Sequence, residues 1–179
     1  MLKKIVVIGP ESAGKSTLCQ QLADHYQTEW CPEYAREYLL KHGKKYSNDD
    51  LLVIAKGQLA LEDRFAREMT ARPPANPYLF IDTDMLVMKV WSEFVFNTCH
   101  PFILDQVAVR QYDLYLLCDI DIPWAPDPLR EYPDLPTRER LFLMYKDILV
   151  NQSTPWIIVS GTRENRLAQV TAAINKHLT

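Results

Sequence analysis

One eight-residue pattern near the start of the chain constrains its fold more than any other feature. The run from Gly9 to Ser16, G-P-E-S-A-G-K-S, satisfies G-x-x-x-x-G-K-[ST] and follows the apolar, β-branched segment 3–8. A strand, a glycine-rich turn and a helix in this order are the context that a phosphate-binding P-loop requires. The pattern arises by chance at roughly one position in 10⁴ to 10⁵ at average amino-acid usage. We therefore predict a P-loop between a buried parallel strand and a helix.

Short apolar runs alternate with longer segments of helical periodicity along the chain. This alternation predicts βαβ units and a three-layer α/β P-loop NTPase sandwich with a five-stranded parallel sheet. We expect residues 1–179 to form a single domain, because one domain usually has this size. Strands are expected at 3–8, 28–31, 78–81, 114–118 and 156–159, and helices at 16–26, 34–42, 49–70, 84–96, 141–150 and 162–178.

The segment of about 119–137 is expected to form a lid. Residues 119–136 contain five prolines and many acidic side chains, and loops this long are usually functional or disordered. A small α/β core with such a loop after the fourth strand suggests a kinase whose lid closes over ATP and excludes water. Arg130 lies inside the loop, and Arg138 and Arg140 lie just beyond it. Arg130 is our first candidate to stabilise the transferred phosphoryl group, although each arginine is alternatively a solvated surface residue.

The predicted P-loop implies a set of nucleotide contacts. Its amide groups and the following helix N-terminus would face the phosphates of ATP, Lys15 would bridge the β- and γ-phosphates, and Ser16 would bind Mg²⁺. The loop 160–166 precedes the last helix, where Arg163 is a candidate contact for adenine and Thr162 is a candidate N-cap. The expected ATP contacts are Gly9, Glu11, Ser12, Ala13, Gly14, Lys15, Ser16, Thr17 and Arg163.

Three carboxylates are candidates for the chemistry. Asp82 ends the third apolar run at the carboxyl edge of the sheet, where it would join Ser16 in the magnesium shell. Asp84 could share that role and contact the substrate, or it could only complement a helix dipole. Glu33 follows the second strand and could accept the proton of an acceptor hydroxyl that Arg36 orients. The alternative for Glu33 and Arg36 is an ordinary i, i+3 ion pair on a helix.

Composition and motifs exclude several classes of protein. A net charge of −3 provides no broad basic surface, so we expect no nucleic-acid partner. The apolar run before Gly9 is too short for a signal peptide or a membrane span, which predicts a cytoplasmic protein without a membrane partner. Four cysteines and four histidines lack metal-ligand spacing and predict reduced thiols. A GTPase is disfavoured because neither D-x-x-G nor N/T-K-x-D is present where it would be expected, and no obligate protein partner is evident.

Four further sequence motifs resemble those of a known family. They are W-C-P-E-Y-A-R-E-Y-L at 30–39, F-I-D-T-D at 80–84, Y-D-L-Y-L-L at 112–117 and D-I-D-I-P-W at 119–124. With the P-loop, the chain resembles the ribosylnicotinamide kinase family, and most closely the kinase domain of bacterial bifunctional nicotinamide-nucleotide adenylyltransferase/ribosylnicotinamide kinases. The resemblance implies ATP-dependent phosphorylation of the 5′-hydroxyl of nicotinamide riboside, giving nicotinamide mononucleotide for NAD salvage. No H-x-G-H-type motif is present, so we expect a stand-alone kinase.

The acceptor implied by the resemblance has a pyridinium ring. Such a cation favours aromatic faces and carboxylates, for which Tyr34, Trp91 and Trp124 are available. Trp124 lies between prolines in the expected lid. Trp91 lies on an expected helix, where an aromatic side chain is most often buried in the core. Two alternatives stay open: a P-loop kinase for another nucleoside or nucleoside monophosphate, and a regulatory module that binds ATP without transferring phosphate.

Overall fold

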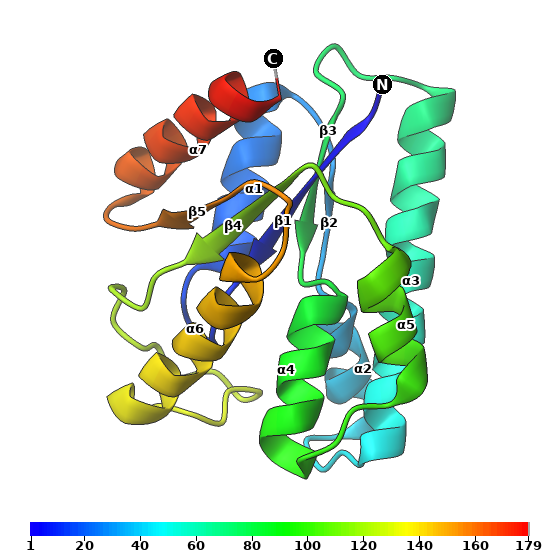
Figure 1. Ribbon diagram of the computed structural model, residues 1–179, viewed down its shortest axis with the longest axis vertical. Coiled ribbons are helices and arrows are strands. Elements are labelled where there is room, and N and C mark those ends of the chain that lie inside the picture. The colour runs from blue at the N-terminus through cyan, green and yellow to red at the C-terminus, as the bar shows by residue number, and fades with distance from the viewer. Residues whose placement is uncertain (179) are drawn as a thin grey trace.

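A computed structural model of the chain describes residues 1–178, which form a five-stranded parallel sheet with helices on both faces (Figure 1). The strand order β2-β3-β1-β4-β5 places β1 at the centre, paired with β3 and β4. This confirms the predicted α/β fold with five parallel strands. The strands are β1 (Lys3–Ile8), β2 (Trp30–Cys31), β3 (Tyr78–Asp82), β4 (Leu114–Cys118) and β5 (Trp156–Val159).

Seven helices complete the three layers. Apolar residues of β1 alternate between two cores, so Ile5 and Val7 face α1 and α7, whereas Val6 and Ile8 face α3, α4 and α6. Figure 1 shows α1 and α7 on the same side of the sheet, and α2 and α5 pack with α3 and α4 in a third, all-helical cluster. The helices are α1 (Lys15–Tyr26), α2 (Tyr34–His42), α3 (Asn48–Ala71), α4 (Met85–Phe96), α5 (Pro101–Val109), α6 (Leu135–Val150) and α7 (Arg163–His177).

The structure differs from the sequence prediction in two helices. Helix α5 was not expected; His100 caps it by accepting a hydrogen bond from the Phe102 amide, and Pro101 occupies its first turn. Helix α6 begins at Leu135, six residues before the expected start at 141. Asp134 caps α6 through the amide of Thr137. Because α6 starts at Leu135, only residues 119–134 of the expected lid contain no helix or strand, and we call this stretch the lid segment.

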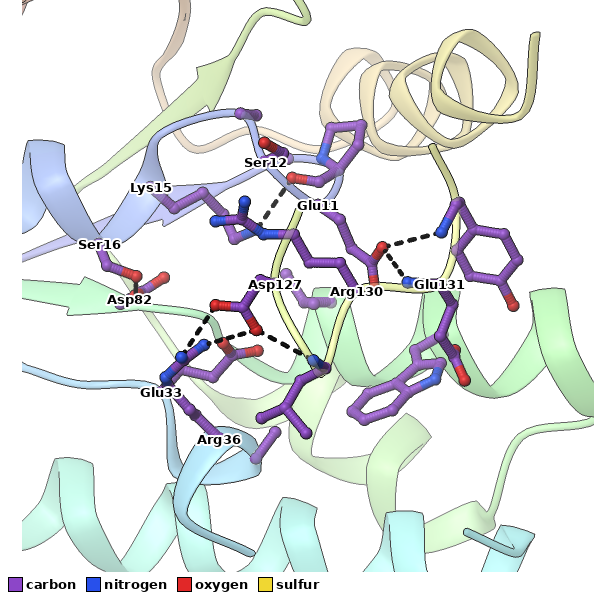
Figure 2. Close-up of a pocket in the computed structure, with 18 of the residues that line it drawn as sticks. Glu11, Ser12, Lys15, Ser16, Glu33, Arg36, Asp82, Asp127, Arg130 and Glu131 are labelled. Atoms are coloured by element: carbon purple, nitrogen blue, oxygen red, sulfur yellow. Dashed lines mark hydrogen bonds and ion pairs between the residues drawn. The ribbon is translucent and has the colours of Figure 1, made fainter. Parts of the chain in front are cut away.

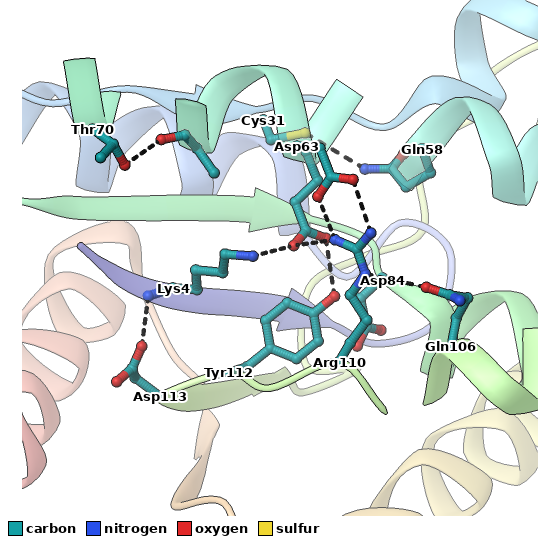
Figure 3. Close-up of polar contacts among 12 residues, drawn as sticks. Lys4, Cys31, Gln58, Asp63, Thr70, Asp84, Gln106, Arg110, Tyr112 and Asp113 are labelled. Carbon is teal, nitrogen blue, oxygen red and sulfur yellow. Dashed lines mark hydrogen bonds and ion pairs between the residues drawn. The ribbon is translucent and has the colours of Figure 1, made fainter. Parts of the chain in front are cut away.

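A buried polar cluster ties the amino-terminal end of the sheet to α3 and α5 (Figure 3). Glu62 is fully buried and accepts hydrogen bonds from Lys4 Nζ at 2.9 Å, Arg110 at 3.3 Å and the Tyr112 hydroxyl at 2.9 Å. Arg110 also contacts both carboxylate oxygens of Asp63, at 2.6 and 2.9 Å. Glu62, the fully buried charge of this cluster, is thus paired with Lys4 and Arg110 at the end of the sheet opposite the P-loop.

None of the helices in residues 1–178 has both the length and the apolar composition needed to cross a membrane. The four cysteines are free thiols, as predicted, and three of them are buried.

Candidate active site

The P-loop lies at the carboxyl end of the central strand β1, where parallel sheets commonly bind ligands. Gly9 has φ 143°, and a Cβ atom there would lie 2.9 Å from the carbonyl oxygen of Cys118 on β4. Gly14, with φ 83°, immediately precedes α1. Both positions therefore require glycine, one for close approach to β4 and the other for a left-handed turn. The result is a helix N-terminus with free amide groups, which attracts anions.

A cavity of about 510 Å³ opens over this loop (Figure 2). All of residues 9–17 line it, together with Glu33 and Arg36 near the start of α2, Asp82 at the end of β3, and lid residues 127–132. Trp91 and Phe94 of α4 and Leu141 and Tyr145 of α6 form an apolar part of the wall. Its volume is in the range of small-molecule sites, and its charged groups gather at the P-loop side.

Ser16 and Asp82 bring two oxygens together beside the P-loop. The Ser16 hydroxyl donates a hydrogen bond to Asp82 Oδ2 at 2.5 Å, and Asp82 is only 1% exposed. Burial raises the pKa of Asp82 above its usual value, opposed by Lys15 and by the Ser16 hydrogen bond. Mg²⁺ binds one or two protein oxygens together with waters and phosphate oxygens, so this pair has the chemistry of a Mg²⁺-nucleotide site.

Lys15 folds back over its own loop. Its Nζ donates a hydrogen bond to the carbonyl oxygen of Pro10 at 3.0 Å and lies in the cavity near Glu33 and Asp82 (Figure 2). A lysine on a flexible stem can exchange this single carbonyl contact for a phosphate oxygen.

Glu33 is the residue before α2, but its side chain does not cap that helix. The carboxylate lines the cavity, as Figure 2 shows. Burial raises its pKa to about 7, with a smaller contribution from Asp82 and opposition from Lys15. A carboxylate with a pKa near the working pH is suited to accept a proton. The helical ion pair with Arg36 that the sequence left open does not form, because Arg36 pairs with the lid instead.

Hydrogen bonds join the segment 119–134 to the P-loop. Glu11 Oε2 accepts hydrogen bonds from the amides of Glu131 at 2.8 Å and Tyr132 at 3.1 Å. Ser12 Oγ accepts one from the Ala125 amide at 3.0 Å. These contacts join residues 125–132 to the P-loop beside the cavity.

Side chains of the segment 119–134 form a second set of contacts, with Arg36 of α2 and with Tyr46. Arg36 and Asp127 contact each other through two nitrogen–oxygen pairs, at 2.9 and 3.4 Å, and the Arg36 hydrogen bond lowers the pKa of Asp127. The Tyr46 hydroxyl donates to Glu131 at 2.7 Å and accepts from Trp91 Nε1 at 2.9 Å. Arg130 lines the cavity and donates to the Ala125 carbonyl oxygen. Arg36 therefore links the start of α2 to Asp127 of the segment 119–134.

Four of the expected contacts, among them Asp84, lie outside the cavity lining. Asp84 is 1% exposed and caps α4, accepting hydrogen bonds from the amides of Leu86 and Val87 and from the Tyr115 hydroxyl. Its carboxylate oxygens therefore already accept hydrogen bonds within the protein, which agrees with the alternative that Asp84 serves the N-terminus of a helix.

The other three are Tyr34, Trp124 and Arg163. The Tyr34 ring packs over Gly57 of α3, where it would lie 2.1 Å from an added Cβ atom. The Trp124 ring nitrogen is buried without a hydrogen-bond partner. Arg163 is exposed at the first turn of α7, and its backbone carbonyl oxygen accepts from Gln21. Adenine would thus have to bind outside this cavity in order to contact Arg163.

The sequence prediction missed Arg166, which is 3% exposed and clamps three loops together. It donates to the carbonyl oxygens of Ala13 at 2.7 Å, Gly161 at 3.1 Å and Asp119 at 3.4 Å, and it forms an ion pair with Asp121. The P-loop is thereby fixed to the start of the lid and to the loop before α7. A charged residue on the apolar face of an otherwise amphipathic helix was the available signal.

Comparisons with known proteins agree with the fold. A family model described as "AAA domain" matches residues 4–166. The trifunctional NAD biosynthesis/regulator protein NadR of Escherichia coli (strain K12) is 32% identical over 135 residues, which are 72% of this chain and 31% of that protein. The chain thus spans about a third of the length of this curated relative.

Solved structures of NadR share the fold. NadR in complex with NR has a TM-score of 0.77 at 23% identity and covers 99% of this chain and 50% of its own. NadR in complex with NAD and AMP-PNP has a TM-score of 0.75 at 23% identity, with 98% and 49% coverage. The predicted resemblance is confirmed by these relatives. Because the family model covers most of the chain, this protein belongs to the AAA-domain family and has the three-layer P-loop fold that the alternating strands and helices predicted.

Proposed function

We propose that this chain is an ATP- and Mg²⁺-dependent kinase that phosphorylates the 5′-hydroxyl of nicotinamide riboside and forms nicotinamide mononucleotide. The observation that carries the proposal is the convergence of Lys15, the Ser16–Asp82 pair and Glu33 on one lid-covered cavity. The NadR relatives, one of them described in complex with NR and another with AMP-PNP, support the choice of acceptor and donor.

The P-loop binds the donor in this proposal. Its amides and the N-terminus of α1 hold the β- and γ-phosphates, and Lys15 leaves the Pro10 carbonyl oxygen to neutralise them. Ser16 and Asp82 would hold Mg²⁺, which neutralises phosphate charge and orients the γ-phosphate when bound. The fastened lid excludes water, so that hydrolysis of ATP does not compete with transfer.

Glu33 deprotonates the acceptor in this proposal. Glu33 and Asp82 are the cavity carboxylates that neither cap a helix nor contact the lid, and Asp82 is assigned to Mg²⁺. The raised pKa of Glu33 favours proton uptake. Asp127 and Glu131 add carboxylates to the same cavity, and Trp91 and Tyr46 present aromatic surface to it. A pyridinium ring fits this combination of carboxylates and aromatic faces.

Turnover with Mg-ATP and nicotinamide riboside tests the proposal directly. ADP release and formation of the phosphorylated riboside, identified by mass spectrometry, should both occur, and Lys15→Ala should abolish them. Lys176→Ala on the exposed part of α7 is the matched control and should keep wild-type activity. Faster turnover of another nucleoside in a riboside panel would contradict the acceptor assignment. ATP binding without turnover of any acceptor would favour the regulatory module instead.

A further inference from the structure

Gln58 is a buried side chain of α3 that hydrogen-bonds the backbone on both sides of Glu33. Its Oε1 accepts a hydrogen bond from the Tyr34 amide at 2.7 Å, and its Nε2 donates to the carbonyl oxygen of Pro32 at 3.4 Å. The same Nε2 lies 3.5 Å from the carbonyl oxygen of Asp82. Gln58 is 1% exposed and lies outside the cavity lining. One side chain thus joins the residues that flank the proposed base to the end of β3.

Gln58 provides the helix-capping contact that Glu33 does not. Tyr34 is the first residue of α2, and its amide is one of the N-terminal donors that have no partner inside the helix. A side-chain oxygen at the preceding position commonly accepts hydrogen bonds from such donors, but Glu33 makes no capping hydrogen bond. Because Gln58 satisfies the Tyr34 amide instead, the Glu33 carboxylate is left to face the cavity (Figure 2).

The residue next to Gln58 anchors the same segment by packing. The Tyr34 ring lies over Gly57, where an added Cβ atom would be 2.1 Å from the ring. Only glycine leaves room for so close an approach. Tyr34 is therefore held to α3 twice, through its amide by Gln58 and through its ring by Gly57.

A side-chain amide is the group that suits this place. The Tyr34 amide needs an acceptor and the Pro32 carbonyl oxygen needs a donor, and glutamine supplies both without a charge. The other buried residues of α3 are apolar except Glu62, which has its own charged partners at the far end of the sheet. A polar residue on this buried face requires hydrogen-bond partners, and Gln58 finds them in the backbone around Glu33.

We propose that Gln58 is a positioning residue for phosphoryl transfer, which keeps the Glu33 carboxylate turned toward the acceptor hydroxyl by binding the backbone of Pro32 and Tyr34. Gln58 acts through Glu33 and touches no substrate. Without Gln58 the Tyr34 amide loses its acceptor, and the adjacent Glu33 carboxylate is the group that replaces it. The base then faces the helix instead of the acceptor. This inference rests on the proposed function and deepens it by naming what orients the base.

The test compares Gln58→Met with Gln152→Met, after circular dichroism has shown that each variant is folded. Gln152 is a matched control, because its side chain also accepts from one backbone amide and donates to one carbonyl oxygen, both of Thr154. It precedes β5, at the end of the sheet opposite the P-loop. Steady-state kinetics with Mg-ATP and nicotinamide riboside are measured for both variants.

Gln58→Met should lower kcat by about tenfold or more, because misplacement of a catalytic group by about 1 Å costs up to roughly 10²-fold. KM for each substrate should stay within about twofold of wild type, because the substrate contacts are unchanged. Gln152→Met should keep both kcat and KM within about the same twofold range. A folded Gln58→Met with wild-type kcat overturns the inference. So does a variant whose KM values rise as kcat falls, which is the pattern of a site distorted as a whole.

A crystal structure of Gln58→Met is a readout that needs no turnover. The Glu33 carboxylate should accept hydrogen bonds from the amides at the start of α2, and a carboxylate that still faces the cavity overturns the inference. Should Gln58→Met fail to fold, Gly57→Ala decides, because its methyl group displaces the other anchor of Tyr34. Lower kcat at unchanged KM then supports the inference, and wild-type kcat overturns it. A wild-type protein that turns over no riboside refutes the proposed function, and the position of Glu33 in the variant crystal still decides the role of Gln58.

Discussion

Replacement of Arg166 by methionine should destabilise the whole protein, because this side chain joins three loops at the carboxyl edge of the sheet. The change removes an ion pair with Asp121 and leaves the buried carbonyl oxygen of Ala13 without its donor. Loss of one member of a buried pair costs about 3–5 kcal/mol, and the lower end applies here because the Asp121 side chain is 32% exposed. At about 2–4 °C per kcal/mol for a chain of this size, Tm should fall by roughly 6–12 °C.

Thermal unfolding followed by circular dichroism measures this effect. Arg163→Met is the matched control, because Arg163 is exposed on the same helix and should shift Tm by less than about 2 °C. If Arg166→Met also stays within that range, the clamp contributes nothing to stability and the reasoning from its contacts is wrong.

Three further changes probe packing, chemistry and the lid. Gly57→Ala should lower the free energy of unfolding in urea by up to about 2 kcal/mol, because the added Cβ meets the Tyr34 ring at 2.1 Å; unchanged stability would contradict this. Since the pKa of Glu33 is raised to about 7, kcat/KM for ATP should rise about tenfold per unit as pH increases up to 7 and then level off. Glu33→Gln should abolish turnover at every pH, and a profile without an inflection near 7 would exclude this role. Glu11→Ala removes the acceptor of two lid amides, so proteolytic cleavage within 119–134 should accelerate by roughly 5–30-fold for a loss of 1–2 kcal/mol.

The sheet could be predicted from the sequence because each strand is a short apolar run, and β1, β3 and β4 are largely buried. The P-loop could be predicted because its glycines and lysine are adjacent in sequence. Helix α5 was missed since its residues are mostly apolar and show little amphipathic period, although His100 and Pro101 carried a start signal. The early start of α6 was missed because Pro136 was taken as part of the lid, whereas proline is tolerated in a first helical turn.

The parts of the site that depend on distant contacts were harder to predict. Arg166 donates to Ala13 across 153 positions of sequence, and no local pattern reports such a contact. Asp84 shows the opposite problem, because one sequence position suits both a site carboxylate and a helix cap. Only the structure shows that the α4 amides and the Tyr115 hydroxyl use its oxygens. The hydrogen bonds from the Glu131 and Tyr132 amides to Glu11 likewise join distant residues, so no local sequence pattern reports them.

The proposed function requires that the turn after β1 binds the phosphates of a nucleotide. Isothermal titration of the wild-type chain and of Lys15→Ala with Mg-ATP tests it most directly. The account predicts saturable binding at one site per wild-type chain and at least a tenfold loss of affinity in the folded variant. A folded wild-type protein that produces no binding heat at several temperatures, or a variant that binds as tightly as wild type, would contradict it.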